Sequence, residues 1–434
     1  MTSAQPNIVL VSIDSLRADH CGYLGDERGL TPTLDVLADG GIAFENAVAP
    51  GPQTFSSVPA SFTGAYRPAG GVEQYPGATH WERRLAAIES HLDWYAPLQE
   101  RLQDEGYTTA GFSPNPWTSS ASGFDRGFDH FADISGRDRD GRIAALADRL
   151  PGVDPESKPV QLTLDLLTGS SFFAGWRGFY DELDRIRAGL EEPYFLWVFL
   201  MDTHFPFITA RRDREEQSLL GMYYNTYRTE GAMRGTAADL SGDGVGALKR
   251  SYRDAVRASD AFLSRLHTET RADDPVLLVH SDHGESLGEH GNFGHHHRRP
   301  FEENVHVPFV VHNAGVTETV EEPLSLASLH DVTLSVARDG TVDPSRFTDA
   351  DAISASECGR YRAVRGERYK LLDLDGEERL YDLARDPNER DDIAADRPER
   401  VGRMRDRLEA FERHRNETGR LRQVVHEQAG RGVL

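Results

Sequence analysis

The sequence predicts an α/β protein with a mixed, mostly parallel sheet sandwiched by helices, followed by a smaller α+β domain. Short continuous apolar runs rich in β-branched residues recur along the first three quarters of the 434-residue chain, and helical patterns separate them. Such runs are typical of strands buried on both faces of a parallel sheet. The length suits one large domain and one smaller domain.

The larger domain is predicted from its strands in chain order. The first apolar run ends at Asp14, and the first three runs are each followed at once by polar residues. Apolar residues at three- and four-residue steps from Leu248 to Leu266 predict a helix. A second helix, over about 97–105, is predicted to end at Gly106, a candidate left-handed cap. The predicted strands cover residues 7–13, 194–200, 275–280 and 307–311.

The pattern changes after residue 317, where short strands, a hairpin over 371–380 and a charged helix over about 398–419 follow. We therefore predict a catalytic domain over 1–317 and a smaller domain over 318–434. Three polar, Gly-rich or weakly periodic segments interrupt the larger domain, and we interpret them as insertions that shape substrate choice. These segments are 66–96, 134–190 and 205–245.

The charge composition indicates a salt-adapted surface. The formal net charge is −23, and lysine occurs only at positions 158, 249 and 370. An acidic, lysine-poor surface stays hydrated at high ionic strength and repels nucleic acid, which favours a halophilic, haloarchaeal origin. The alternative, an acidic patch that recruits a basic partner, is disfavoured because the charges are dispersed.

The chain lacks the signals of export and of membrane insertion. No run approaches the roughly 18 apolar residues that span a bilayer, and the N-terminus lacks a secretory layout, so a cytoplasmic location is expected. Cys21 and Cys358 are too few for a disulfide framework and have no CxxC spacing. No apolar stripe is surplus to the core, so no oligomeric state is predicted.

A metal site is the first chemical hypothesis. Asp282 and His283 follow directly after a predicted strand, and both side chains can reach one ion if the backbone turns at Gly284. Asp14 ends another strand, where a carboxylate is costly to bury unless it is paired or bound to metal. Taken singly, either acid could instead cap a helix. Together they suit Ca²⁺, Mg²⁺, Mn²⁺ or Zn²⁺.

A nucleophile is predicted in the hydroxyl-rich segment from Thr54 to Gly64. This segment leads into a helix, whose free N–H groups and positive dipole end favour an anion. A serine oxygen placed there could be a metal-activated nucleophile. The alternative is an ordinary Ser or Thr cap.

Taken together, these motifs resemble the sulfatase family of the alkaline phosphatase superfamily, over nearly the whole chain. Ser57-Val-Pro-Ala-Ser61 falls on that family's Cys/Ser-x-Pro-x-Arg signature, and Asp202-Thr-His204 looks like its strand end with a substrate-facing His. The other similar segments are 7–19, 31–47, 194–201, 281–285, 289–296, 301–310 and 381–389.

The resemblance implies an alkaline-phosphatase-like fold and a set of roles. It implies metal ligation by Asp14, Asp282 and His283, with Ca²⁺ the ion most typical of the family. Ser57 would be the nucleophile, with conversion to formylglycine uncertain because the signature Arg is replaced by Ser61. The remaining roles fall on His204 and His296 as catalytic residues and on Asn115 and His297 as substrate-binding residues, with His295 as a neighbour of similar chemistry.

Three functions are consistent with these residues. The first is metal-dependent hydrolysis of a small-molecule or carbohydrate sulfate ester. The second is a phosphodiesterase, phosphonate monoester hydrolase or phospho-group transferase that uses unmodified Ser57. The third is a catalytically inactive, metal-stabilised binding protein, since two positions of the family pattern are changed. None of these requires nucleic acid or membrane insertion.

Overall fold

The computed structural model describes residues 5–68, 79–135, 175–233, 240, 242–296 and 298–430. Within these residues the main sheet has eight strands in the order β11-β2-β10-β7-β1-β6-β4-β5. The strands are β1 (Ile8–Ile13), β2 (Gly41–Phe44), β4 (Thr108–Ser113), β5 (His130–Asp133), β6 (Tyr194–Leu200), β7 (Val276–Ser281), β10 (Phe309–His312) and β11 (Glu318–Val320).

The sheet is mixed and mostly parallel, which confirms the predicted fold class. β1 lies between β6 and β7 and is parallel to both. β10 runs antiparallel to β7 and to β2. All six residues of β1 are buried, as expected for an apolar strand that is covered on both faces. The four predicted strands are all present.

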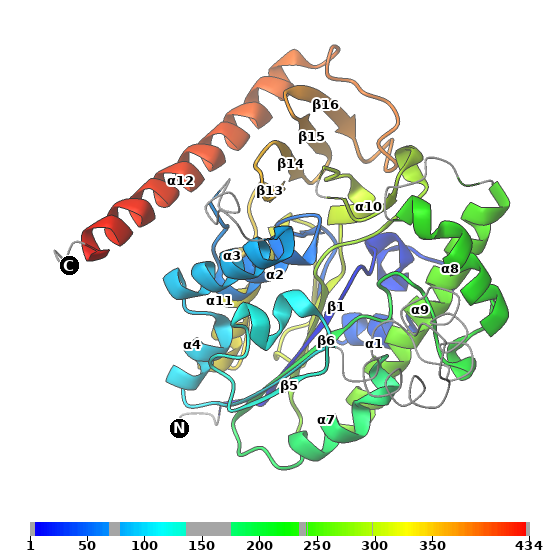
Figure 1. Cartoon of the computed structure of the whole chain (residues 1–434), viewed down its shortest axis with the longest axis vertical. Helices are drawn as coiled ribbons and strands as arrows, with labels where there is room; N and C mark the ends of the chain where they lie inside the picture. The colour runs from blue at the N-terminus through cyan, green and yellow to red at the C-terminus, as the bar shows by residue number, and fades with distance from the viewer. Residues whose placement is uncertain are drawn as a thin grey trace, which may run out of the picture.

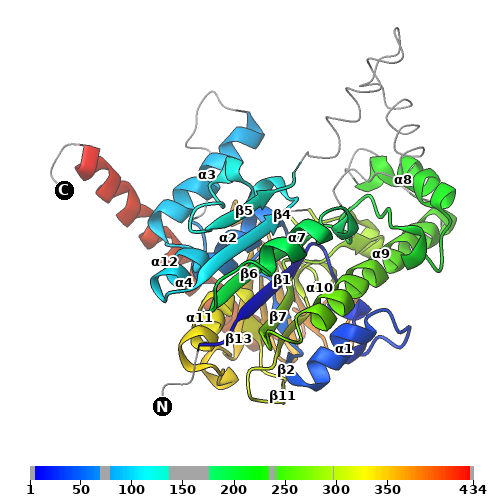
Figure 2. The same cartoon turned by 90° about the horizontal axis from the view of Figure 1, so that it is seen from below.

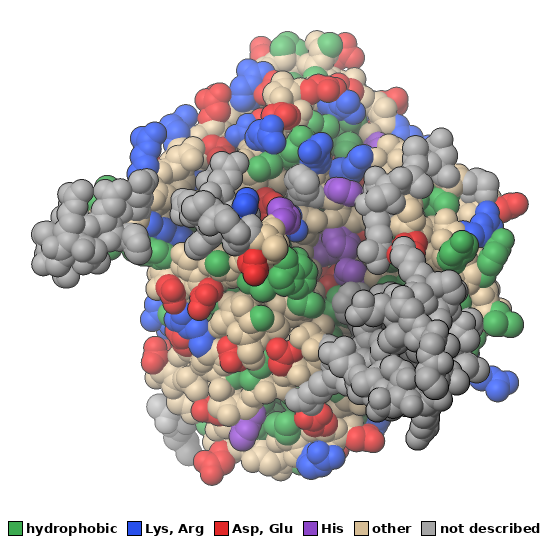
Figure 3. All heavy atoms as spheres, in the orientation of Figure 1, with side chains coloured by type: hydrophobic (Ala, Val, Ile, Leu, Met, Phe, Trp, Pro, Cys, Tyr) green, Lys and Arg blue, Asp and Glu red, His purple; other side chains and the backbone are tan. Residues whose placement is uncertain are grey.

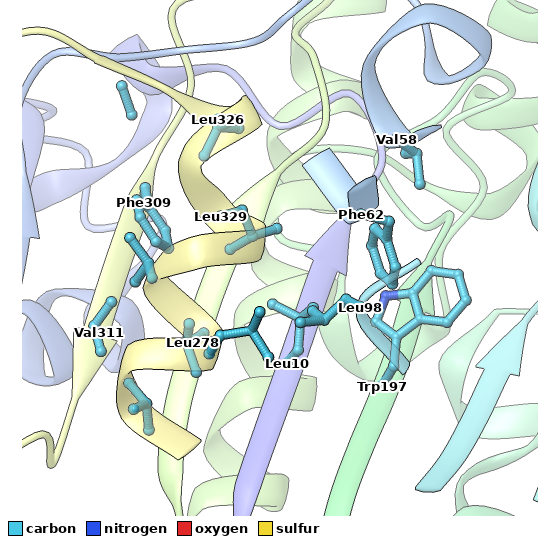
Figure 4. Close-up of a cluster of buried hydrophobic side chains, with 14 of the residues drawn as sticks. Leu10, Val58, Phe62, Leu98, Trp197, Leu278, Phe309, Val311, Leu326 and Leu329 are labelled. Carbon is cyan, nitrogen blue, oxygen red and sulfur yellow. The ribbon is translucent and has the colours of Figure 1, made fainter. Parts of the chain in front are cut away.

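Helices cover both faces of the sheet (Figures 1 and 2). Successive side chains of β1 point to opposite faces, so Leu10 joins one hydrophobic core and Val11 joins the other. Figure 4 shows Leu10 on the side of Phe62 and Leu329, which come from helices on the first face. The first face carries α2 (Thr54–Thr63), α3 (His80–Trp94), α4 (Leu98–Asp104) and α11 (Leu329–Asp339), and the second carries α1 (Pro32–Asp39), α7 (Tyr180–Arg187) and α9 (Gly242–Glu269).

A four-stranded antiparallel sheet lies near the C-terminus and packs against the start of α12 (Pro398–Gly430), which extends away from the body (Figure 1). Val401 and Leu408 of α12 pack on this sheet, and the predicted hairpin is formed by its last two strands. The strands are β13 (Asp351–Ala355), β14 (Tyr361–Gly366), β15 (Tyr369–Leu374) and β16 (Glu377–Asp382).

The structure places the change of sheet later than the predicted boundary at 317/318. β11 pairs in parallel with β2 inside the main sheet, and α11 packs on the same core. The antiparallel sheet begins only at Asp351. A three-residue edge strand such as β11 carries too little pattern for the sequence to assign it to one sheet or the other.

All three predicted insertions contain regular structure, and α7 falls in the second. α3 falls in the first, and a capping box between Thr79 and Glu82 fixes its start. α8 (Leu219–Met233) falls in the third. Residues 69–78, 136–174, 234–239 and 241 lie outside the described residues. Among the residues that the structure describes, no helix combines the length and apolar character needed to cross a membrane.

Candidate active site

Polar side chains meet at the carboxyl ends of four neighbouring strands. Asp14 directly follows β1, and Asp282 directly follows the adjacent β7. His204 follows β6, and Asn115 follows β4. The predicted convergence of strand-end residues at one edge is therefore present in the structure. This edge is where ligands gather in open α/β sheets.

Asp14, Asp282 and His283 form a compact cluster, and all three are fully buried. One potential ligand atom from each lies within 4.8 Å of the others. The Nε2 atom of His283 is 3.7 Å from Asp14 Oδ1 and 3.5 Å from Asp282 Oδ2. Its Nδ1 lies 2.9 Å from the carbonyl of Gly284, and donation there leaves the Nε2 lone pair facing the carboxylates.

The electrostatics of the cluster fit a cation. Burial and the proximity of Asp14 raise the pKa of Asp282 well above its ordinary value. Burial also raises the pKa of Asp14, but nearby imidazoles, chiefly that of His204, outweigh it and the pKa lies below its ordinary value. Asp282 Oδ2 has no hydrogen-bond partner among the described residues. Two carboxylates and one imidazole suit a divalent metal ion.

Neighbouring groups hold Asp14 in place. Ser15 donates its hydroxyl to Asp14 Oδ1 at 2.7 Å and its backbone N–H to Asp282 at 3.3 Å. Its backbone has a φ of 63°, a conformation rare for serine. Asn115, which is predicted to bind substrate, donates to Asp14 Oδ2 at 3.0 Å. Asn115 therefore contacts the cluster itself.

Gly284 is required for a reason other than the predicted sharp turn. A Cβ atom at this position would lie 2.1 Å from the carbonyl oxygen of Glu303, and the Gly284 N–H donates to Asn304 at 2.9 Å. Gly284 is absent from the residues with positive φ. Its role is to let two backbone segments approach closely, which brings the segment of Glu303 against the cluster of Asp14, Asp282 and His283.

Within the described hydroxyl-rich segment 54–64, the hydroxyl that reaches the cluster is that of Thr54, the first residue of α2. Its Oγ1 lies 3.2 Å from His283 Nε2 and 3.5 Å from Asp14 Oδ2. Ser57 lies one turn further along α2, is fully buried, and its hydroxyl has no hydrogen-bond partner among the described residues. The first residues of a helix carry free backbone N–H groups that favour an anion. Because α2 begins at Thr54, this argument favours Thr54 over Ser57 as the hydroxyl next to a bound ester.

His295 faces the cluster. Its ring centroid is 4.5 Å from that of His283 and 5.1 Å from that of His204. Its Nδ1 lies 3.2 Å from both carboxylate oxygens of Glu285, which is fully buried. Burial opposes a charge on His295, but Glu285 and the cluster carboxylates outweigh it and raise its pKa to about 9. The contact with Glu285 favours the protonated form of His295.

His295 contacts the cluster, and the predicted catalytic role of His296 stays a prediction. Burial lowers the pKa of His296 below its ordinary value, and His297 lies outside the described residues. A short hairpin of β8 (Ser286–Leu287) and β9 (Phe293–Gly294) returns the chain so that His295 meets Glu285. Figure 3 shows His side chains gathered in a hollow near the centre of this face.

The mixed sheet carries this acidic, imidazole-bearing cluster at its carboxyl edge, and its fold is that of solved sulfatase-like structures. The chain belongs to the Sulfatase family, whose profile matches residues 6–337. Enzymes of this family bind a divalent metal, and the cluster of Asp14, Asp282 and His283 could hold one.

Known relatives agree with this placement. An arylsulfatase from Clostridium perfringens is 22% identical over 443 residues, covering 89% of each chain. The crystal structure of a phosphonate monoester hydrolase of Agrobacterium radiobacter aligns with a TM-score of 0.67 at 19% identity, over 95% of this chain and 96% of that one. A structure solved with its substrate D-glucosamine-2-N,6-O-disulfate aligns at 0.59 and 16% identity, over 95% and 98%. The solved structures establish the shared fold.

Proposed function

We propose that this protein hydrolyses a sulfate ester and that the hydroxyl of Thr54, rather than that of Ser57, attacks the sulfur. The observation that carries this is the position of Thr54 Oγ1, 3.2 Å from His283 Nε2 and 3.5 Å from Asp14 Oδ2, at the start of α2. Family membership and the arylsulfatase relative support a sulfate ester as substrate.

Asp14, Asp282 and His283 would hold one divalent ion, Ca²⁺ by family resemblance. Such an ion lowers the pKa of an adjacent hydroxyl and balances charge on the transferring oxygens. Ser15 and Asn115 keep Asp14 oriented for this task through their hydrogen bonds. The first backbone N–H groups of α2 add donors for the oxygens of the ester.

The reaction then proceeds in two steps, transfer of the sulfuryl group to Thr54 and hydrolysis of the resulting ester. Thr54, having lost its proton to solvent, forms an Oγ–S bond as the S–O bond to the alcohol breaks, and protonated His295 gives its proton to the departing oxygen. Water next attacks the sulfur of the Thr54 sulfate ester and gives one proton to His295 as the Oγ–S bond breaks, which releases hydrogen sulfate and regenerates the deprotonated Thr54 oxygen. Glu285 keeps the imidazole in place throughout, through contacts of 3.2 Å.

A threonine nucleophile at position 54 excludes conversion of that residue to formylglycine. Oxidation of a serine side chain yields an aldehyde, whereas a threonine has a secondary carbon and would yield a ketone. Thr54 therefore acts as an unmodified hydroxyl. Formylglycine at Ser57 remains the alternative, although the Ser57 side chain is fully enclosed.

A second candidate function is hydrolysis of a phosphate diester or phosphonate monoester. An unmodified hydroxyl beside a metal cluster suits phosphoryl transfer through a Thr54 ester. The fold shared with the phosphonate monoester hydrolase is compatible with this chemistry.

The test is an ester panel on the purified, metal-loaded protein, combined with a peptide mass across Gln53–Arg67. We expect the highest kcat/KM with an aryl sulfate and an unmodified mass at both Thr54 and Ser57. Preferential cleavage of a phosphate diester or phosphonate would support the second function. A protein that binds metal but cleaves none of the esters would be the non-catalytic relative.

A further inference from the structure

An aromatic surface begins beside the candidate site. The turn after β4 carries Asn115 at one end and Trp117 at the other, and Asn115 Oδ1 accepts the backbone N–H of Trp117 at 2.9 Å. Because the same Asn115 side chain donates to Asp14, this turn connects the metal cluster to an indole ring two residues away. The position of Trp117 is thereby fixed relative to the cluster.

The surface continues to solvent through Trp81, in the first turn of α3. The centroids of Trp81 and Trp117 lie 4.0 Å apart, with 41° between the ring planes. Trp81 is 46% exposed. On its other side Trp117 meets the ring of Phe55 at 5.8 Å, and Phe55 is the neighbour of Thr54. The aromatic side chains therefore extend from Phe55, which follows the proposed nucleophile in α2, to the outside.

A guanidinium group supports these rings. The Cζ atom of Arg84, one turn along α3 from Trp81, lies 5.0 Å from the Phe55 ring centroid and 5.7 Å from that of Trp117. Arg84 is held in turn by an ion pair with Glu357 at 3.0 Å. A cation placed this way stabilises aromatic faces, so the platform is preorganised.

We propose that Trp81 and Trp117 form a platform that stacks on the flat apolar face of a ring in the alcohol portion of the ester. This inference rests on the proposed function and adds the substrate class to it: an aryl ester or a pyranose ester, rather than a small alkyl ester. The metal cluster can select the ester group alone, whereas a half-exposed indole next to the site offers a surface for the rest of the molecule.

A purely structural role would not account for the exposed face of Trp81. Trp94, at the far end of the same helix, is 39% exposed and lies 5.5 Å from the guanidinium of Arg422 of α12. It has no link to the cluster comparable to that of Trp117, so Trp94 offers a matched control of the same residue type on the same helix.

The experiment compares Trp81→Ala and Trp94→Ala with the wild type, using phenyl sulfate, methyl sulfate and a methyl glucoside 6-sulfate. Loss of one stacked ring costs on the order of a tenfold change in binding. We expect the kcat/KM preference for a ring ester over methyl sulfate to fall about tenfold in Trp81→Ala, through KM, and to persist in Trp94→Ala. The ring ester with the larger loss identifies the ring type.

An unchanged preference in Trp81→Ala would overturn the platform while leaving the proposed function intact. If the wild type cleaves no ester, the proposed function fails, and calorimetry of benzenesulfonate and methanesulfonate with the metal-loaded protein then decides the platform separately. Weaker benzenesulfonate binding in Trp81→Ala alone supports it, and equal binding in all three proteins overturns it.

Discussion

Thr54 and Ser57 lie one turn apart on α2, and the two hydroxyls have opposite surroundings. The Thr54 hydroxyl contacts Asp14 and His283, and the Ser57 hydroxyl has no hydrogen-bond partner among the described residues. We therefore expect Thr54→Val to lower kcat on the best ester at least about a thousandfold, because it removes the nucleophile. Ser57→Ala is expected to retain kcat within about threefold. Steady-state kinetics with both variants, checked by circular dichroism, would contradict the proposal if the two effects were reversed.

Asp282 provides a prediction about metal binding. Its carboxylate is fully buried beside Asp14, so Asp282→Ala removes one of three ligands and is expected to reduce bound divalent metal from one ion per chain to nearly none. Elemental analysis after dialysis measures this.

Asp202 is the matched control. It is also an acid at the end of a strand, and burial raises its pKa to about 7. Asp202→Ala is expected to retain the ion. Stoichiometric metal in Asp282→Ala would remove Asp282 from the ligand set.

At the scale of elements, α10 (Glu302–Val305) connects the main sheet to the antiparallel sheet through buried charges. Lys370 of β15 is fully buried, 2.9 Å from Glu302 and 3.0 Å from Glu389. Burial is the chief cause that raises the pKa of Glu389 to about 8, which indicates that Lys370 compensates this acid only in part.

Removing that lysine is expected to be costly. Lys370→Met leaves the buried Glu389 without its cation, whereas Glu302 keeps Arg365 at 3.1 Å, and should lower the free energy of unfolding by about 3–5 kcal/mol. Arg368→Met provides the control, because Arg368 is 47% exposed and its pair with Asp382 lies at the surface, where such pairs are worth about 0–1 kcal/mol. Urea unfolding measures both, and similar losses for the two variants would contradict this account.

The elements also show where prediction from sequence succeeds. Asp14 and Asp282 could be placed together because each directly ends a strongly apolar strand, and strand order then fixes their meeting. Thr54 and His295 could not be chosen in this way. The proposed nucleophile depends on which residue of a hydroxyl-rich segment begins α2, and Thr54 and Ser57 differ by three positions. His295 depends on a hairpin whose path uses Gly288 and Gly294 at φ of 111° and 77°, and backbone angles of this kind leave no periodic pattern.

At the scale of the whole molecule, the net charge of −23 sets the response to salt. Self-repulsion among surface carboxylates opposes the compact state, and screening weakens it as the Debye length falls from about 10 Å at 0.1 M to about 3 Å at 1 M. We therefore expect the midpoint of thermal unfolding to rise by several degrees between 0.1 and 2 M KCl. Sucrose at equal osmolality is the control, and an equal rise in both would assign the effect to excluded solute rather than to charge.

The central position of β1 has a consequence for the time at which this protein can fold. β1 is complete at Ile13, whereas its two sheet neighbours end at Leu200 and Ser281. At about 5–20 residues per second, a ribosome needs on the order of 10 to 50 s to produce the second neighbour. Throughout that interval β1 and Asp14 lack the β7 side of the sheet. The nascent chain is therefore a long-lived candidate for chaperone binding, and its candidate site can assemble only after β7 and the residues that follow it have been made.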